Sequence, residues 1–163
     1  MNHAMLQRIV EEVAARLRRR ALSTATLSVA QLGEADIRSL LCQHASLRIV
    51  QVDLPLLEEL TGQRALAAAG CALHEAMAWG VRVQLTLLPA LLPALAVKKL
   101  ARLPLTFSDP PGQPVRLHAA SVLTYADVAR LHGGYLVLRR RPIITALARE
   151  AAVARHVQLI TQE

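Results

Sequence analysis

Large aliphatic side chains near the start of the chain recur at helical spacing. Within the stretch 5–20 they take positions i, i+3, i+4, i+7 and i+11, and charged residues fill most of the positions between them. This apolar stripe consists of Leu6, Ile9, Val10, Val13 and Leu17. Acidic residues precede the arginines at 18–20, an order that suits the helix dipole. The pattern predicts an amphipathic helix with Asn2 as its N-cap.

Beyond a polar connector at 21–28, strand-like and helix-like patterns alternate. The hydrophobic positions predict strands at 26–32, 47–54 and 81–88, and helices at 34–43 and 64–80. Pro55 is expected to end the second of these strands, and Gly80 to close the longer helix. A strand, a helix and a strand in succession indicate a parallel crossover.

The second half of the chain continues the alternation. Pro89 and Pro93 favour short helical turns, and the stretch 108–113 forms a turn between two short strands. The remaining elements are a helix at 124–134, a strand at 135–140, a helix at 146–156 with Thr145 as its N-cap, and a strand at 157–162. We therefore predict an α/β fold. It consists of a single three-layer domain over residues 23–163 with a mostly parallel sheet, preceded by an amphipathic docking or targeting helix at 1–22.

Composition narrows the class of protein. Residues of the hydrophobic class make up 53% of the 163 positions, enough for one domain with a substantial core, and the low aromatic content of 2% means that aliphatic residues build this core. The apolar stretch 85–97 is too short to span a bilayer and contains two prolines. With no secretory signal and only two cysteines, we expect a soluble cytoplasmic protein.

The net charge of +7 raises the question of nucleic-acid binding. The excess comes mainly from arginines, clustered at 18–20 and 139–141, and the aromatic side chains that stack on bases are almost absent. We therefore expect no nucleic-acid partner.

Signatures of catalysis are missing from the sequence. The glycine-rich phosphate loops, the nucleophile elbow and the helical zinc motif all have no match. Cys71 and His74 lie on one predicted helix, but even with Cys42 and His44 their spacing does not require a metal site, so a buried cysteine and an ordinary helical histidine are favoured. We expect no catalytic residue, no metal and no cofactor.

One segment has the chemistry of an anion site. Arg139, Arg140 and Arg141 lead from a strand to a helix capped by Thr145, and the first amides of a helix suit an anion such as phosphate. The alternative is that the arginines keep the strand end soluble and that Thr145 only caps its helix.

The first helix also leaves alternatives open. A helix of this length is marginal by itself and needs a surface on which to bury its stripe. That surface is a partner protein, the chain's own domain, or a membrane interface.

A resemblance favours the first of these, and we expect no membrane partner. The stretch "LQRIVEEVAARL" is similar to the short helices that direct enzymes into bacterial microcompartments. Together with "VKKLARLPL" and "ITALAREAAVARHVQLI", it resembles the assembly-protein family of propanediol-utilisation microcompartments over nearly the whole chain.

The resemblance implies a non-catalytic structural protein. Its family is needed to assemble the body in which 1,2-propanediol is metabolised by coenzyme B12-dependent enzymes. Its implied partners are microcompartment shell proteins, encapsulated pathway enzymes, or both, and its implied location is the microcompartment. The oligomeric state stays open. The alternative function is a small α/β enzyme or ligand-binding protein that recognises a phosphorylated compound near Arg139–Thr145.

Overall fold

The computed structural model describes residues 2–162 and contains a seven-stranded sheet of two parallel halves. In the first half, β1 (Thr24–Ser28), β2 (Ser46–Val50), β3 (Arg82–Thr86) and β4 (Leu105–Ser108) lie side by side in chain order, all parallel. In the second half, β5 (Pro114–His118), β7 (Tyr135–Leu138) and β9 (Gln158–Ile160) are parallel to one another. The antiparallel pairing of β4 with β5 joins the halves, so the two sets of strands run in opposite directions.

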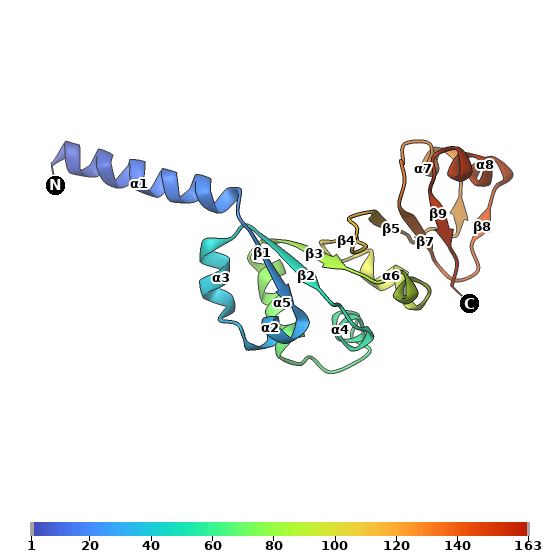
Figure 1. Ribbon diagram of the computed structural model, residues 1–163, viewed down its shortest axis with the longest axis horizontal. Coiled ribbons are helices and arrows are strands. Elements are labelled where there is room, and N and C mark those ends of the chain that lie inside the picture. The colour runs from blue at the N-terminus through green and yellow to red at the C-terminus, as the bar shows by residue number, and fades with distance from the viewer. Residues whose placement is uncertain (1, 163) are drawn as a thin grey trace.

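Helices cover a different face of each half (Figure 1). Under the first half lie α2 (Val29–Glu34), α3 (Ile37–Gln43), α4 (Leu54–Leu60), α5 (Ala68–Ala78) and the 3-10 helix η1 (Pro89–Ala94). On the same side, α6 (Val97–Leu100) contacts β5 of the second half. Over the second half lie α7 (Tyr125–Val128) and α8 (Ala146–Ala154), next to a small sheet of β6 (Val122–Leu123) and β8 (Ile143–Ile144). The predicted α/β class with a mostly parallel sheet is confirmed, although the two helical layers do not lie opposite each other.

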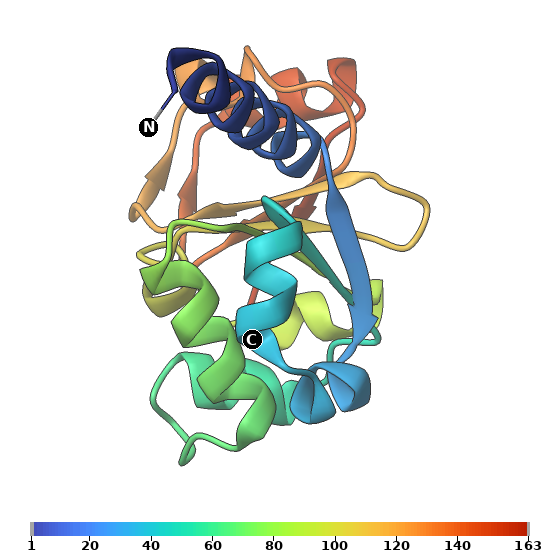
Figure 2. The same cartoon turned by 90° about the vertical axis from the view of Figure 1, so that its left-hand side faces the viewer.

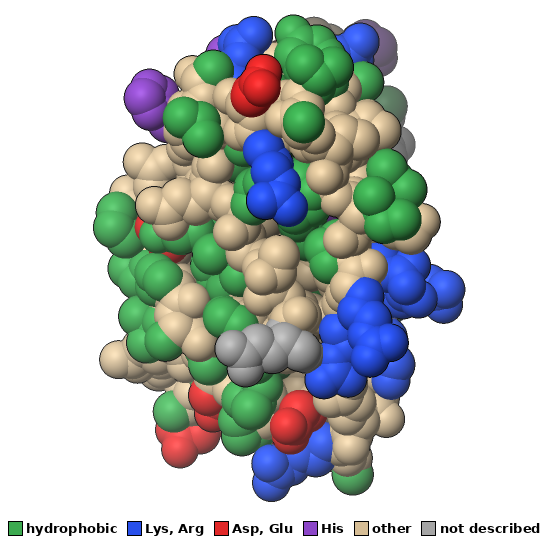
Figure 3. All heavy atoms as spheres, turned by 90° about the vertical axis from the view of Figure 1, so that its right-hand side faces the viewer, with side chains coloured by type: hydrophobic (Ala, Val, Ile, Leu, Met, Phe, Trp, Pro, Cys, Tyr) green, Lys and Arg blue, Asp and Glu red, His purple; other side chains and the backbone are tan. Residues whose placement is uncertain are grey.

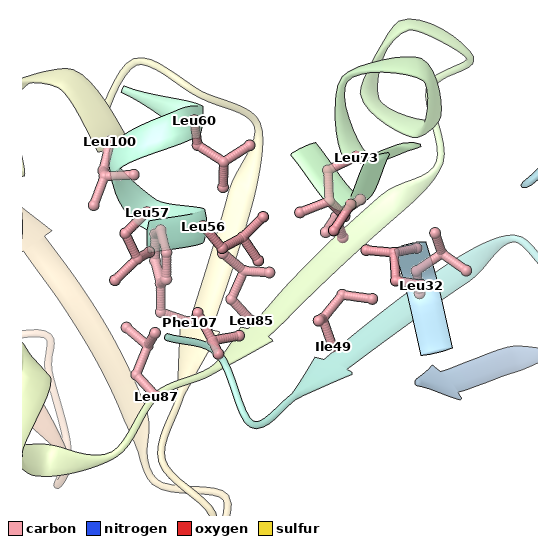
Figure 4. Close-up of a cluster of buried hydrophobic side chains, with 14 of the residues drawn as sticks. Leu32, Ile49, Leu56, Leu57, Leu60, Leu73, Leu85, Leu87, Leu100 and Phe107 are labelled. Carbon is pink, nitrogen blue, oxygen red and sulfur yellow. The ribbon is translucent and has the colours of Figure 1, made fainter. Parts of the chain in front are cut away.

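Alternation along the strands explains this arrangement. In β2, Leu47 and Ile49 are buried on the face that the helices cover, while Arg48 between them is exposed on the other face. Successive side chains of a strand point to opposite faces of a sheet. The larger core lies between the sheet and the helices under its first half, where leucines from the helices meet Leu85 and Phe107 (Figure 4). It extends to Val115 of β5 and Val137 of β7 in the second half. In the second half, Leu136 and Leu138 instead face α8 on the opposite side.

Two predicted segments near the start differ from the structure. The stretch 21–28 is not a connector but contains β1, and the strand predicted at 26–32 ends at Ser28, whose hydroxyl accepts a bond from the Gln31 N–H and begins α2. Likewise, Pro55 does not end β2. It lies in the first turn of α4, a position where proline lacks only an N–H that has no helical partner.

Helix lengths also differ from expectation. Helix α5 begins at Ala68 rather than at 64, because the N–H groups of Gln63 and Arg64 both turn back to the carbonyl of Glu58. Gly80 follows this helix with a φ of +72°, as expected for a terminating glycine.

Helix α7 is much shorter than the segment predicted at 124–134, with only 4 residues. At its start, the backbone N–H and the hydroxyl of Thr124 both donate to Asp127 at 2.8 Å, which lowers the pKa of this carboxyl from its ordinary value of 3.8. None of the helices that the structure describes has the length and apolarity to cross a membrane.

Candidate interaction surfaces

The first helix, α1 (His3–Ala21), extends away from the body of the protein (Figure 1). None of its described residues is buried. The side chains of the apolar stripe keep between 44% and 58% of their surface exposed, and Met5 beside them keeps 59%. Because monomeric proteins rarely leave a continuous apolar surface uncovered, this stripe is the first candidate for an interaction surface. Asn2 is the N-cap residue of this helix, as predicted, but its side chain makes no capping hydrogen bond.

In the described part of the chain, hydrogen bonds fix the C-terminal end of α1 to the domain. The Arg20 guanidinium donates to the Leu41 carbonyl at 2.9 Å, and the Ala45 N–H donates to the Arg20 carbonyl at 3.2 Å. Further along the helix, Glu12 accepts a bond from Arg16 at 2.9 Å within α1 itself. The stripe is therefore not used for packing within this chain, and the self-packing alternative does not describe the structure.

A second surface is the uncovered side of the first half of the sheet. Here Thr26, Arg48, Gln84 and Thr106 are register partners across β1–β4, and we call these four residues the open face. Figures 1 and 2 show α1 at one end of this surface and the α7–α8 layer at the other. Gln84 accepts from Arg48 at 3.4 Å and donates to the Ser108 hydroxyl at 2.9 Å, so the surface is polar and hydrogen-bonded.

The open face continues into a hollow of about 790 Å³ at the carboxyl ends of these strands. Sequence analysis did not find this surface. The alternating polar residues of each strand were its signal, but which strands are neighbours is a property of the fold.

A third surface contains the arginines singled out in the sequence. Lys98 and Lys99 of α6 line one hollow with Arg139 and Arg140, although about forty positions separate the two segments. Figure 3 shows basic side chains gathered on one side of this end of the protein. No acidic side chain is among the described residues that line the hollow. The two lysines could not be associated with these arginines from the sequence, because the packing of α6 brings them together.

The rest of the predicted anion site is arranged differently. Thr145 caps α8, where its hydroxyl accepts from the Ala148 N–H and donates to the Leu123 carbonyl, both at 3.2 Å. Neither Thr145 nor Arg141 lines the hollow beside Arg139 and Arg140. The capping function of Thr145 is thus confirmed, and the structure associates the lysines of α6, rather than Thr145, with these arginines.

Cysteines and histidines form no cluster in the described part of the chain. Cys42 and Cys71 are free and exposed, so the expectation of a buried cysteine is wrong. On α5, residue 71 lies on the side of the helix away from the core that Leu73 enters. His44 bonds to the Ser23 hydroxyl at 2.6 Å. Across residues 2–162, no three metal-binding side chains come together.

These features define an α/β protein with an amphipathic helix outside its core, and comparison with known proteins gives its family. Residues 8–158 match the family described as "Putative propanediol utilisation". The chain belongs to this propanediol-utilisation family, which confirms the resemblance noted in its sequence.

Two relatives match over their whole length. The chain is 58% identical over 163 residues to the "Bacterial microcompartment assembly protein PduM" of Salmonella typhimurium strain LT2, and the match covers 100% of both chains. It is 55% identical over 170 residues to the protein of the same name from Citrobacter freundii, again over 100% of both. No solved structure gives a significant match.

Proposed function

We propose that this protein is a non-catalytic assembly protein of the propanediol-utilisation microcompartment. In this proposal, residues 1–22 dock on a microcompartment component, a shell protein or an encapsulated enzyme, and the α/β domain at 23–163 contacts another. The names of the two PduM relatives support the assembly role and the location in the microcompartment.

The observation that carries the proposal is the exposure of the apolar stripe. The protein builds two hydrophobic cores, yet leaves Val10 and Leu17 each 58% exposed on a helix that its own domain does not cover. An amphipathic helix presented in this way fits an apolar groove on another protein. Burial of a stripe of this size gives modest affinity once the costs of association are met.

The α/β domain supplies the second contact, and the open face supports this role. Its side chains offer both donors and acceptors on a surface without a covering helix. Two modest contacts made by one molecule reinforce each other, because the first raises the effective concentration for the second. Such a molecule links two components without carrying out chemistry.

A pair of aspartates in the stripe tests the docking helix. Ile9→Asp combined with Val13→Asp makes insertion into an apolar groove costly, because a buried unpaired carboxylate is unfavourable. We expect the variant to be lost from purified microcompartments while the wild-type protein stays bound. The measurement is the amount of each protein that co-purifies with the microcompartments, with expression levels matched.

The matched control is Ala4→Asp with Ala15→Asp. It introduces the same charge into α1 but away from the stripe, and should co-purify as the wild type does. Equal retention of the Ile9→Asp, Val13→Asp variant would contradict docking through the stripe.

One observation favours a second candidate function, the binding of a phosphorylated compound. The lysines of α6 add positive charge to Arg139 and Arg140 around one hollow, and anions bind where several cations converge. A thermal-shift screen with phosphate esters and nucleotides tests it. A ligand-specific stabilisation that disappears in Lys99→Ala with Arg139→Ala would favour this function, and no shift with any compound would exclude it for those compounds.

A further inference from the structure

The apolar stripe has a symmetry that a single docking partner does not require. Four of its residues, Leu6, Val10, Val13 and Leu17, are spaced by 4, 3 and 4 positions, so both their order and their spacing are the same from either end. An alternation of three and four residues is the seam of a coiled coil, in which side chains of two helices interlock. A stripe of this kind is complementary to a second copy of itself in the reverse direction.

We propose that α1 pairs with α1 of a second copy in an antiparallel, two-fold symmetric coiled coil. Leu6 of one copy packs against Leu17 of the other, and Val10 packs against Val13. This is an isologous contact, in which the same surface serves both partners. The inference rests on the exposed stripe itself and goes beyond the proposed function.

The shape of the protein permits this pairing. Helix α1 stands clear of the body over most of its length, and the four seam residues keep between 44% and 58% of their surface exposed (Figure 1). In the antiparallel arrangement the two α/β domains lie at opposite ends of the helix pair. Each α1 therefore packs along the exposed part of the other copy's α1 and not against the other copy's domain.

The charges of α1 select the antiparallel direction. Arg18, Arg19 and Arg20 occupy the last turn of the helix. A parallel pair brings both arginine clusters side by side, whereas an antiparallel pair separates them by roughly 20 Å at 1.5 Å per residue. That separation exceeds the screening length of about 8 Å at physiological salt. Repulsion between the clusters therefore opposes only the parallel form.

The size of the seam sets its strength. A single pair of helices with four interlocking layers buries less than the roughly 1,200 Å² that marks the lower end of stable interfaces. We expect a dimer that dissociates in the micromolar range, weak enough for a microcompartment component to displace. Since the same stripe serves both contacts, a paired helix is protected from other apolar surfaces until a component replaces the second copy.

Sedimentation velocity of the purified full-length protein tests the pairing. From low to high micromolar concentration, the wild-type protein should change from monomer to dimer. Ile9→Asp with Val13→Asp should raise the dissociation constant at least about tenfold, because each dimer then carries unpaired carboxylates against its seam. Ala4→Asp with Ala15→Asp should dimerise as the wild type does. A wild-type protein that stays monomeric at every concentration overturns the proposal.

Cysteine cross-linking tests the direction. In a background with Cys42→Ser and Cys71→Ser, which removes the exposed thiols, single variants Leu6→Cys and Leu17→Cys are oxidised separately and as a mixture. The antiparallel seam predicts a disulfide only in the mixture, because a disulfide needs Cα atoms within about 7 Å. Efficient cross-linking of Leu6→Cys to itself overturns the proposal, because it indicates a parallel pair.

The purified protein alone is needed for both measurements, so their outcome is separate from that of the co-purification experiment. A monomer that still binds microcompartments refutes the pairing only. A dimer that is absent from microcompartments refutes the docking function only.

Discussion

Helices α1 and α5 place their hydrophobic side chains in opposite ways. Helix α5 has 11 residues, mostly small, and buries Leu73 and four small residues, including Gly70, against the sheet and its neighbouring helices. Helix α1 has 19 residues, carries the larger aliphatic side chains on its stripe, and buries none of them. The more pronounced amphipathic pattern thus belongs to the helix that lies outside the core.

Connectivity accounts for the difference. Helix α5 lies between β2 and β3, which are adjacent and parallel, so the chain must return along the sheet and the helix covers it. Helix α1 precedes β1 and is not a crossover between any two of the described strands, so their pairing does not determine where it lies. A periodic apolar face shows that a helix needs a partner surface, and the topology decides whether that surface belongs to the same chain.

Truncation of a buried side chain of α5 should change the free energy of unfolding more than any substitution in α1 that is discussed below. Leu73 has no exposed surface, and Leu73→Ala leaves a cavity among the leucines of the larger core. We expect a loss of about 2–5 kcal/mol in the free energy of unfolding. Urea denaturation followed by circular dichroism measures it. A loss below about 1 kcal/mol would mean that α5 contributes far less to the core than its burial indicates.

Sequence analysis succeeded where local pattern decides the structure. The apolar stripe predicts α1, and the alternation in β2 and β3 predicts two buried strands, because both signals lie within one element. It failed where one residue serves two elements, as Ser28 does when it ends β1 and caps α2.

The candidate surfaces follow the same rule. The stripe was found because its residues are close in sequence. By contrast, the open face joins side chains from β1 to β4, and the hollow beside Arg139 and Arg140 joins α6 to the residues that follow β7. These neighbours come from strand order and helix packing, which no local pattern encodes.

Loss of the Arg20 side chain should have an intermediate effect. Its guanidinium bonds to the Leu41 carbonyl of α3 and fixes the end of α1 to the domain. Because this bond is partly buried, Arg20→Ala should lower the free energy of unfolding by about 1 kcal/mol and speed amide exchange in the last turn of α1. Arg19→Ala is the matched control, since Arg19 makes an exposed ion pair with Glu12 at 4.0 Å within α1 itself. Equal effects of the two variants would show that α1 is not held through Arg20.

The smallest expected effect belongs to the stripe itself. Ile9→Asp with Val13→Asp removes two aliphatic side chains that are 46% and 50% exposed, and the core contains neither. In dilute solution, where the protein is monomeric, urea denaturation should therefore give a free energy of unfolding within about 0.5 kcal/mol of the wild type. The same kind of change in α5 would unfold the domain, because it would place carboxylates in the core. If the two stripe substitutions lower the free energy of unfolding by several kcal/mol in dilute solution, α1 must pack on its own domain. Docking through the stripe and pairing between copies would then both require that packing to be undone.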